Sequence, residues 1–408
     1  MPPTLSLCLA TYNRAHYLER YLTHHVSALE AAGVDYELVI SDNCSTDETP
    51  AILARHADAN PRLRVARQAT NVGMYPNVLS TLYRARGEIV VSIADDDLAV
   101  FPQLLIYVQR MLDDPSLVMV QSPWLLRDEQ NGDAIMGKFY DLEVERRLRV
   151  GDYANCLEFV IQNQVFPECS IVRRAIIPSI IAPPQRFVFS FLAMLAHALG
   201  KGDVLFCPEP HILATAISKD AEVHVGDREA MESWDTYRGG LELLASYARQ
   251  FNPGGLPDTA AVGRAIQRFV WKRMAVAARL QARARHWSNA YQILRRLHAY
   301  DLTADFGVDY NRIARLAAIE TALLECRQRG AEIVVLGADV TDDLAASIKV
   351  VEGLEVFRAE VVGSGNSRRA YCSDSPPPDG LLRDGDFHCD LAAVIERFPD
   401  FRSARPQA

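Results

Sequence analysis

The feature that most constrains the fold is an alternation, over the first hundred residues, of short apolar runs with longer amphipathic stretches. The apolar runs are residues 5–10, 36–41, 62–66 and 88–94. The stretches with helical spacing of apolar residues are 17–31, 49–59 and 77–85. Strands that alternate with helices pair in parallel, because each helix returns the chain to the same edge of the sheet. The sequence therefore predicts an α/β domain with a mostly parallel sheet covered by helices on both faces.

The rest of the chain changes character twice. The α/β pattern continues to about residue 225, with an irregular stretch at 127–150 and an apolar helix at 187–199. The segments that follow are helical at 226–330 and mixed at 331–408. We therefore expect an N-terminal α/β domain at 1–225, a helical region, and a small α/β module for an accessory or oligomerisation role. The strands expected in that last module are 332–337 and 354–362, on either side of a helix at 341–350.

Composition sets the broad class of the protein. Of its 408 residues 49% are hydrophobic and 23% are charged, which is typical of a soluble globular protein. The net charge of −9 argues against a nucleic-acid partner, because such proteins usually carry a basic excess. The eight cysteines form no Cys-x-x-Cys pair and are expected as small buried side chains in a reducing compartment. Met1-Pro2-Pro3-Thr4 lacks the features of a signal peptide, so we expect a cytoplasmic protein.

Polar side chains follow three of the expected strands, each at the carboxyl end. Thr11-Tyr12-Asn13-Arg14 follows the first strand, residues 41–47 (SDNCSTD) the second, and Asp95-Asp96-Asp97 the fourth. In an open parallel sheet, ligands bind in the crevice beyond the carboxyl ends of the strands. The three clusters therefore define one candidate site, although each alone is also explained as a loop or a helix cap.

The three successive carboxylates, Asp95-Asp96-Asp97, give the sharpest chemical signal. They repel one another, so the turn needs a cation or solvent. Carboxylate oxygens suit Mg²⁺ or Mn²⁺, which bind through one or two carboxylates plus substrate phosphates. Such an ion neutralises a diphosphate leaving group as a glycosyl–phosphate bond breaks. The alternative is a solvated acidic turn that caps the helix near Phe101.

The N-terminal half resembles a family 2 glycosyltransferase of the GT-A fold in the segments LCLATYNRAHYLERYL, VISDNCSTDET and NVGMYPNVLSTLYRARGEIVVSIADDD. The resemblance covers residues 4–125 and weakens toward residue 215. It implies a GT-A nucleotide-diphospho-sugar transferase domain. The implied activity is metal-dependent transfer of a hexose or deoxysugar from a nucleotide-diphosphate sugar to a hydroxyl acceptor, in bacterial surface polysaccharide or glycoconjugate synthesis.

The resemblance also implies which residues contact the nucleotide. These are Thr11, Tyr12, Arg14, Asp42, Asn71, Gly73, Asn77, Asp95 and Asp96. The first three would line the pocket, Asp42 would contact the base or ribose, and the segment from Asn71 to Asn77 would close the other side.

The metal assignment within the acidic trio stays open. The commoner family form is Asp-x-Asp-Asp, and Ala94 stands where its first Asp would be. We expect Asp97 to bind Mn²⁺ or Mg²⁺, with Asp95 as a second ligand that also faces the ribose. Some GT-A enzymes add a downstream His, for which the candidates are His224 and His211. A lone His is more often structural.

The general base is less clearly marked. Many inverting members carry a Glu-Asp pair about 90 residues after the metal motif, but residues 185–191 (QRFVFSF) contain no acid. An inverting transfer needs a base within hydrogen-bond reach of the acceptor oxygen. We expect Glu168 as the catalytic base, with Glu209 as the alternative, although a surface-loop Glu is an equally good explanation. Without a base, a retaining or substrate-assisted route would be required.

One segment is strongly basic. Residues 259–300 contain eight Arg, one Lys and no Asp or Glu, a formal charge of +9. One interpretation is a helical pair that contacts anionic lipid, as a peripheral protein on the inner face of the membrane. The other is a helical appendage whose Arg residues pair with acids of the first domain or of a second subunit in a homo-oligomer.

A nucleotidyltransferase and a non-catalytic scaffold are the two alternatives to a glycosyltransferase. A nucleotidyltransferase would need a Gly-rich phosphate loop after the first strand, and LATYNRAHY has no Gly. A non-catalytic nucleotide-sugar or carbohydrate-binding scaffold, derived from a GT-A domain, would explain the missing Glu-Asp pair. The expected partners of a transferase are a UDP-, GDP-, CDP- or dTDP-linked sugar donor and a glycan or lipid-linked acceptor.

Overall fold

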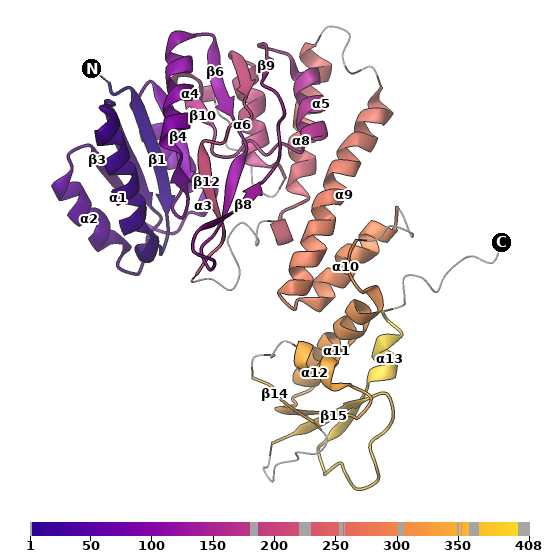
Figure 1. Cartoon of the computed structure of the whole chain (residues 1–408). Helices are drawn as coiled ribbons and strands as arrows, with labels where there is room; N and C mark the ends of the chain where they lie inside the picture. The colour runs from indigo at the N-terminus through magenta and orange to yellow at the C-terminus, as the bar shows by residue number, and fades with distance from the viewer. Residues whose placement is uncertain are drawn as a thin grey trace. The chain divides into compact units, whose positions relative to one another are not determined.

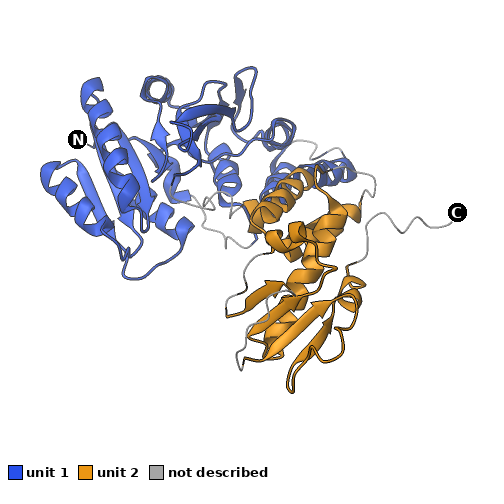
Figure 2. Cartoon of the chain, turned by 60° about the horizontal axis from the view of Figure 1, so that its bottom comes forward, with its two compact units in different colours: residues 1–226, 235–270 blue, residues 227–234, 271–408 orange. Residues whose placement is uncertain are grey.

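A computed structural model gives the fold and describes residues 2–179, 187–219, 230–252, 256, 258–300, 306–348, 351, 353–358 and 367–398. The chain forms two compact units, which Figure 2 distinguishes by colour. The first consists of residues 1–226 and 235–270, and the second of residues 227–234 and 271–408. The three-domain division drawn from the sequence stays a prediction.

The first unit is built on an eight-stranded sheet in the order β3-β2-β1-β4-β10-β6-β11-β9. Its strands are β1 (Leu5–Thr11), β2 (Tyr36–Asp42), β3 (Leu63–Arg67), β4 (Ile89–Ala94), β6 (Leu117–Gln121), β9 (Arg146–Leu148), β10 (Ile171–Arg173) and β11 (Asp203–Phe206). The first four are mutually parallel. β10 runs antiparallel to β4 and β6, and β9 runs antiparallel to β11. The predicted α/β fold with a mostly parallel sheet is confirmed.

Helices cover both faces of this sheet (Figure 1). They are α1 (Ala15–Ala32), α2 (Thr49–Ala59), α3 (Met74–Arg84), α4 (Phe101–Asp113), α5 (Tyr153–Asn163), α6 (Ser190–Leu199) and α8 (Thr236–Phe251). α1, α2 and α4 bury their apolar side chains in one cluster with Leu7 and Leu9 of β1. α3 lies on the opposite face, where the Cys8 thiol contacts the carbonyl oxygen of Thr81. The alternation of side chains along β1 thus assigns each helix to a face.

A second, smaller sheet completes the first unit, in the order β5-β12-β7-β8. Its strands are β5 (Leu98–Ala99), β7 (Trp124–Asp128), β8 (Ala134–Lys138) and β12 (Ile212–Ile217). The prediction that residues 127–150 are irregular is wrong, because β8 and β9 lie within them. Every residue of β8 is exposed, so the sequence shows no apolar alternation there and only pairing with β7 defines the strand.

The larger segment of the second unit starts within α9 (Thr259–Arg283) and continues through α10 (Trp287–His298) and α11 (Tyr310–Gln328) to a parallel sheet ordered β14-β13-β15-β16. The elements of this sheet region are β13 (Ile333–Leu336), α12 (Asp342–Ser347), β14 (Glu355–Arg358), β15 (Arg369–Ser373), β16 (Phe387–Asp390) and α13 (Leu391–Ile395). The expected strand-helix-strand start is present, and β15 and β16 were missed because they are short and follow a loop-like sequence. All eight cysteines are free. No helix in the described ranges is long and apolar enough to cross a membrane.

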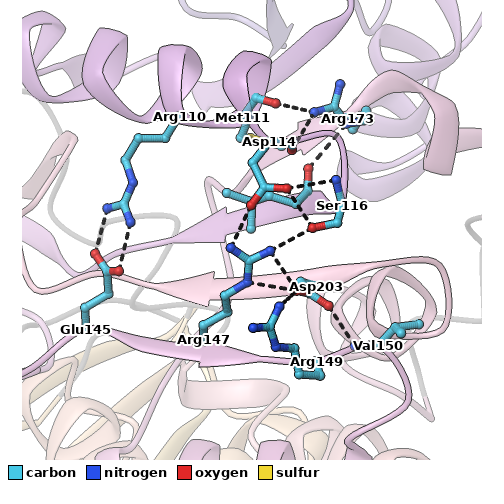
Figure 3. Close-up of polar contacts among 11 residues, drawn as sticks. Arg110, Met111, Asp114, Ser116, Glu145, Arg147, Arg149, Val150, Arg173 and Asp203 are labelled. Carbon is cyan, nitrogen blue, oxygen red and sulfur yellow. Dashed lines mark hydrogen bonds and ion pairs between the residues drawn. The ribbon is translucent and has the colours of Figure 1, made fainter.

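A buried carboxylate, Asp203, connects the edge strand β9 to the sheet (Figure 3). Its Oδ2 accepts hydrogen bonds from Nε of Arg147 at 2.8 Å and from Nη1 of Arg149 at 2.7 Å. Its Oδ1 accepts the backbone N–H of Val150 at 3.0 Å. Burial raises the pKa of Asp203, but these three donors outweigh it and keep the pKa below its ordinary value. This charged cluster therefore fastens β9 to β11, in addition to their strand pairing and the buried side chain of Leu148.

We expect Asp203→Asn to lower the free energy of unfolding by about 2 kcal/mol, because hydrogen bonds to a charged group are each stronger than neutral ones. Chemical denaturation at neutral pH would measure the loss, with Glu143→Gln, an exposed acid on the same segment, as the control. A lowered folded-state pKa stabilises the fold above about pH 4, and the contribution disappears as the pH falls below that value. The difference between the variant and the parent should therefore shrink in acid, and a difference that stayed constant would contradict this account.

Candidate active site

The three polar clusters meet at the carboxyl edge of the central sheet. Thr11 is the register partner of Asp42 on β2, and Ala10 pairs with Ala94 at the end of β4. The turn after β4 therefore lies beside Thr11, whose hydroxyl donates a hydrogen bond to Oδ2 of Asp95 at 2.7 Å. Parallel pairing of β1 with β2 and β4 brings together residues that are more than 80 positions apart in sequence.

The acidic turn, Asp95 to Asp97, is nearly buried, and none of the three residues is more than 8% exposed. Burial, and then the neighbouring charge of Asp96, raise the pKa of Asp95 to about 7. The guanidinium of Arg14 faces the carboxylates of the turn: its Nε lies 3.5 Å from Oδ1 of Asp95, and its Nη2 lies 3.9 Å from Oδ2 of Asp96. The turn is therefore a group of crowded acids, an arrangement that favours a further cation.

The donor atoms of this turn fit a divalent cation. Carboxylate oxygens are the ligands that Mg²⁺ and Mn²⁺ prefer. Across the described ranges, no three His, Cys, Asp or Glu side chains converge into a complete ligand set. An ion bound here would use one or two carboxylates of the turn and complete its shell with donor phosphates and water, as Mg²⁺ commonly does. His224 lies outside the described residues.

The interpretation of His211 as a metal ligand is wrong. This side chain is fully buried, and both of its ring nitrogens are engaged. Nδ1 lies 2.6 Å from the hydroxyl oxygen of Ser122, and Nε2 lies 2.9 Å from the carbonyl oxygen of Cys169. Burial lowers the pKa of His211 to about 4, so the ring is neutral at physiological pH. His211 therefore fixes the segment around Cys169 instead of presenting a nitrogen to an ion.

At this edge of the sheet the side chain of Asp42 is buried, whereas that of Tyr12 is exposed. Asp42 is 1% exposed, and its Oδ1 accepts the backbone N–H of Ser45 at 3.0 Å. Within the described part of the chain its Oδ2 accepts no hydrogen bond, although Nε of Arg67 lies 3.3 Å away. That oxygen can accept one more donor. Tyr12 is 42% exposed, so its ring is accessible to a ligand.

The loop before α3 is fastened to the end of β2. The side-chain amide of Asn43 donates to Oδ1 of Asn71 at 2.9 Å, and its Oδ1 accepts the backbone N–H of Val72 at 2.9 Å. Gly73 precedes α3 with φ of +91°, a conformation that favours glycine. Asn77 is 2% exposed, donates to the carbonyl oxygen of Ser41 at 2.9 Å and accepts its hydroxyl at 2.7 Å. The nucleotide contacts of Asn71, Gly73 and Asn77 stay a prediction.

Glu168 immediately precedes Cys169, whose carbonyl oxygen contacts Nε2 of His211. Burial, and then the charges of Asp97 and Glu168, raise the pKa of the Cys169 thiol. Glu168 is half-buried, whereas Glu209 is exposed. This placement suits Glu168 better than Glu209 for a base, and its catalytic role stays a prediction.

Sequence reasoning missed two residues that contact the acidic turn. Arg127 on β7 donates from Nη2 to the carbonyl oxygen of Asp96 at 3.1 Å. Thr215 on β12 donates its hydroxyl to the same oxygen at 2.6 Å. Both lie in segments without a motif, so no local signal in the sequence could have identified them.

Residues 6–177 match the family model described as glycosyl transferase family 2. The first unit carries a family 2 glycosyltransferase domain. Abequosyltransferase RfbV of Salmonella typhimurium is 29% identical over 143 residues, 31% of this chain and 42% of that protein. The putative teichuronic acid biosynthesis glycosyltransferase TuaG of Bacillus subtilis is 33% identical over 95 residues, 23% of this chain and 36% of that protein. This chain therefore spans less than half the length of these curated relatives.

A solved structure, S. aureus TarS 1-349 in complex with UDP, is 18% identical with a TM-score of 0.47, over 72% of this chain and 82% of that chain.

We expect Asn77→Ala to lower the free energy of unfolding of the family 2 domain by about 2 kcal/mol, because it removes a buried amide that donates to the carbonyl oxygen of Ser41 and accepts the Ser41 hydroxyl. Thermal or chemical denaturation would measure the change. Asn71→Ala is the matched control, since Asn71 is exposed and water can replace its contacts. Equal losses in the two variants would show that Asn77 does not fasten α3 to β2.

Proposed function

We propose that the protein is a glycosyltransferase that moves a sugar from a nucleotide-diphosphate sugar to a hydroxyl acceptor. The observation that carries the proposal is the acidic turn of the family 2 domain. Three acids are buried there beside Arg14, at the same sheet edge as Asp42. A divalent cation and a diphosphate together complete the charge balance of such a turn.

The nucleotide would lie across the ends of β1 and β2. The Tyr12 ring and Arg14 would line its pocket with Thr11, and the Oδ2 of Asp42 would accept a base N–H or a ribose hydroxyl. The loop from Asn71 to Asn77 would close the other side. Arg14 bridges to the acidic turn, so it is suited to contact the diphosphate.

The acidic turn would hold the cation and the ribose. Asp97, with Asp95, would bind Mn²⁺ or Mg²⁺, and Asp95 and Asp96 would face the ribose. The ion would supply Lewis-acid stabilisation of the departing diphosphate. Glu168 would accept the proton of the acceptor hydroxyl as its oxygen attacks the anomeric carbon. His224 remains a candidate further ligand.

The substrate class follows from the named relatives. One is an abequosyltransferase and another is assigned to teichuronic acid biosynthesis. We infer a hexose or deoxysugar donor linked to UDP, GDP, CDP or dTDP, and an acceptor in bacterial surface polysaccharide or glycoconjugate synthesis. A non-catalytic nucleotide-sugar-binding scaffold is the competing proposal, which the absent Glu-Asp pair keeps open.

We expect donor hydrolysis or transfer in the presence of Mn²⁺, measured as release of nucleoside diphosphate from a panel of nucleotide sugars. Asp97→Ala should lower the rate at least about 100-fold, because charge stabilisation of the leaving group is lost. Asp141→Ala, which removes an 80% exposed acid, is the control. Tight nucleotide binding without turnover would favour the scaffold, and no binding of any nucleotide would exclude both proposals.

We also propose that the protein binds peripherally to the inner face of an anionic membrane, and that residues 259–300 make the contact. The side chains Arg264, Arg268, Lys272, Arg279 and Arg283 of α9 are exposed and fall within about 100° of one another around the helix. Arg268, Lys272 and Arg283 make no side-chain hydrogen bond or ion pair with the residues that the structure describes. The buried face of α9, with Phe269 and Met274, is already used within the protein, so the contact would be electrostatic.

We expect the chain to sediment with vesicles that contain anionic phosphatidylglycerol and not with neutral phosphatidylcholine vesicles, and high salt should release it. Reversing Arg268, Lys272 and Arg283 to Glu should abolish the binding. Reversing Arg86, Arg174 and Arg249, which are exposed and lie outside α9, gives the same change in net charge and should leave it intact. Equal loss of vesicle binding in both triple variants would exclude a specific membrane-binding surface on α9. If the α9 variant changed only the oligomeric state, its basic residues would instead be assigned to a homo-oligomer interface.

A further inference from the structure

Two residues on neighbouring strands of the small sheet fix the acidic turn. Arg127 on β7 and Thr215 on β12 are register partners. Thr215 donates its hydroxyl to the carbonyl oxygen of Asp96 at 2.6 Å and its backbone N–H to Oδ1 of Asp97 at 2.8 Å. Arg127 donates from Nη2 to the same carbonyl at 3.1 Å and to the Thr215 hydroxyl. Both the backbone and a carboxylate oxygen of the turn are therefore fixed by this pair.

Arg127 is an unfavourable residue to bury for stability alone. Its side chain is 1% exposed, and its Nε and Nη1 make no hydrogen bond to any residue that the structure describes. A buried donor without a partner destabilises a fold by about 1–3 kcal/mol. Nη2 lies 3.1 Å from Oε1 of Glu129, and Nη1 lies 3.6 Å from Oδ1 of Asp133. Because a buried ion pair often adds no net stability over an apolar pair, the contact of Arg127 with the acidic turn is the better reason for its presence.

The acid that pairs with Arg127 has other partners. Oε1 of Glu129 also accepts a hydrogen bond from Nη1 of Arg20 at 3.0 Å, and its Oε2 accepts the hydroxyl of Tyr17 at 3.1 Å. The guanidinium of Arg14 lies over the Tyr17 ring, 5.6 Å from its centre. Removing Arg127 would therefore leave Glu129 paired, and the network connects the support of the acidic turn to the helix that follows Arg14.

We infer that Arg127 and Thr215 are positioning residues, which orient Asp96 and Asp97 so that the turn can bind a divalent cation together with the donor diphosphate. The inference rests on the proposed function and adds to it the residues that determine cation affinity. Neither side chain needs to touch the cation or the substrate. Groups that hold the ligands of a metal site typically change its affinity by about 10- to 100-fold when they are removed.

Thr215 allows a matched test. Thr215→Val keeps the shape and the backbone N–H to Asp97 but removes the hydroxyl that binds the Asp96 carbonyl, whereas Thr215→Ser keeps that hydroxyl. In the presence of UDP or GDP, Mn²⁺ affinity would be measured from the electron paramagnetic resonance signal of free Mn²⁺. We expect Thr215→Val to weaken it by about 10-fold or more, and Thr215→Ser to stay within about 2-fold of the parent. The Mn²⁺ concentration for half-maximal transfer should shift in the same way, with a smaller change in kcat at saturating Mn²⁺.

Arg127 supplies the second measurement. Arg127→Met should weaken Mn²⁺ binding as Thr215→Val does, while the melting temperature stays within a few degrees of the parent because Glu129 keeps Arg20. Arg127→Lys keeps the charge and should restore part of the affinity. A lower melting temperature with unchanged Mn²⁺ affinity in both Arg127→Met and Thr215→Val would show a structural role only and overturn the inference. A parent protein that neither binds Mn²⁺ nor transfers a sugar would overturn the proposed function, and this inference with it.

Discussion

The repulsion among three acids buried at the end of one strand is the constraint on which the site depends. The pKa of Asp95 is raised to about 7 by burial and by Asp96, so the turn cannot stay fully ionised without nearby positive charge. The structure supplies part of that charge from two directions. Arg14 approaches from the loop after β1, and Arg127 donates to the backbone of the turn from the small sheet. The remaining imbalance is what a cation with its diphosphate would correct.

The part of this site that could be predicted is the part made by local pattern and parallel pairing. Apolar runs separated by helical stretches determine that β1, β2 and β4 run in the same direction, and their polar ends must then meet at one edge. Thr11, Asp42 and Asp95 are adjacent for that reason. No feature beyond residue type and periodicity was needed to bring together side chains from three distant segments.

The part that could not be predicted depends on pairing between segments that carry no pattern. Thr215 contacts Asp97, although the two residues are 118 positions apart in the sequence. Thr215 lies on β12, which pairs with β7, and no sequence pattern predicts either strand. β8 is exposed on both faces, so no apolar period marks it. For His211 the residue type suggested a metal ligand that the structure does not support. Both of its ring nitrogens are engaged, one with Ser122 and the other with Cys169. The periodicity of apolar residues predicts which face of an element is buried, but it does not predict which polar side chains form hydrogen bonds with one another.

Two aspartates of this chain show how a structural acid differs from a candidate functional one. Asp203 is buried, yet two guanidinium groups and one backbone N–H outweigh that burial, and its pKa is lowered. Asp95 is more deeply desolvated, it accepts one hydroxyl, and its nearest guanidinium nitrogen is 3.5 Å away, so burial and Asp96 prevail and its pKa is raised. Further hydrogen-bond donors around Asp95, like those around Asp203, would increase the free energy of unfolding. Since the described part of the protein does not supply them, the missing positive charge is the feature of the fold that a ligand can use.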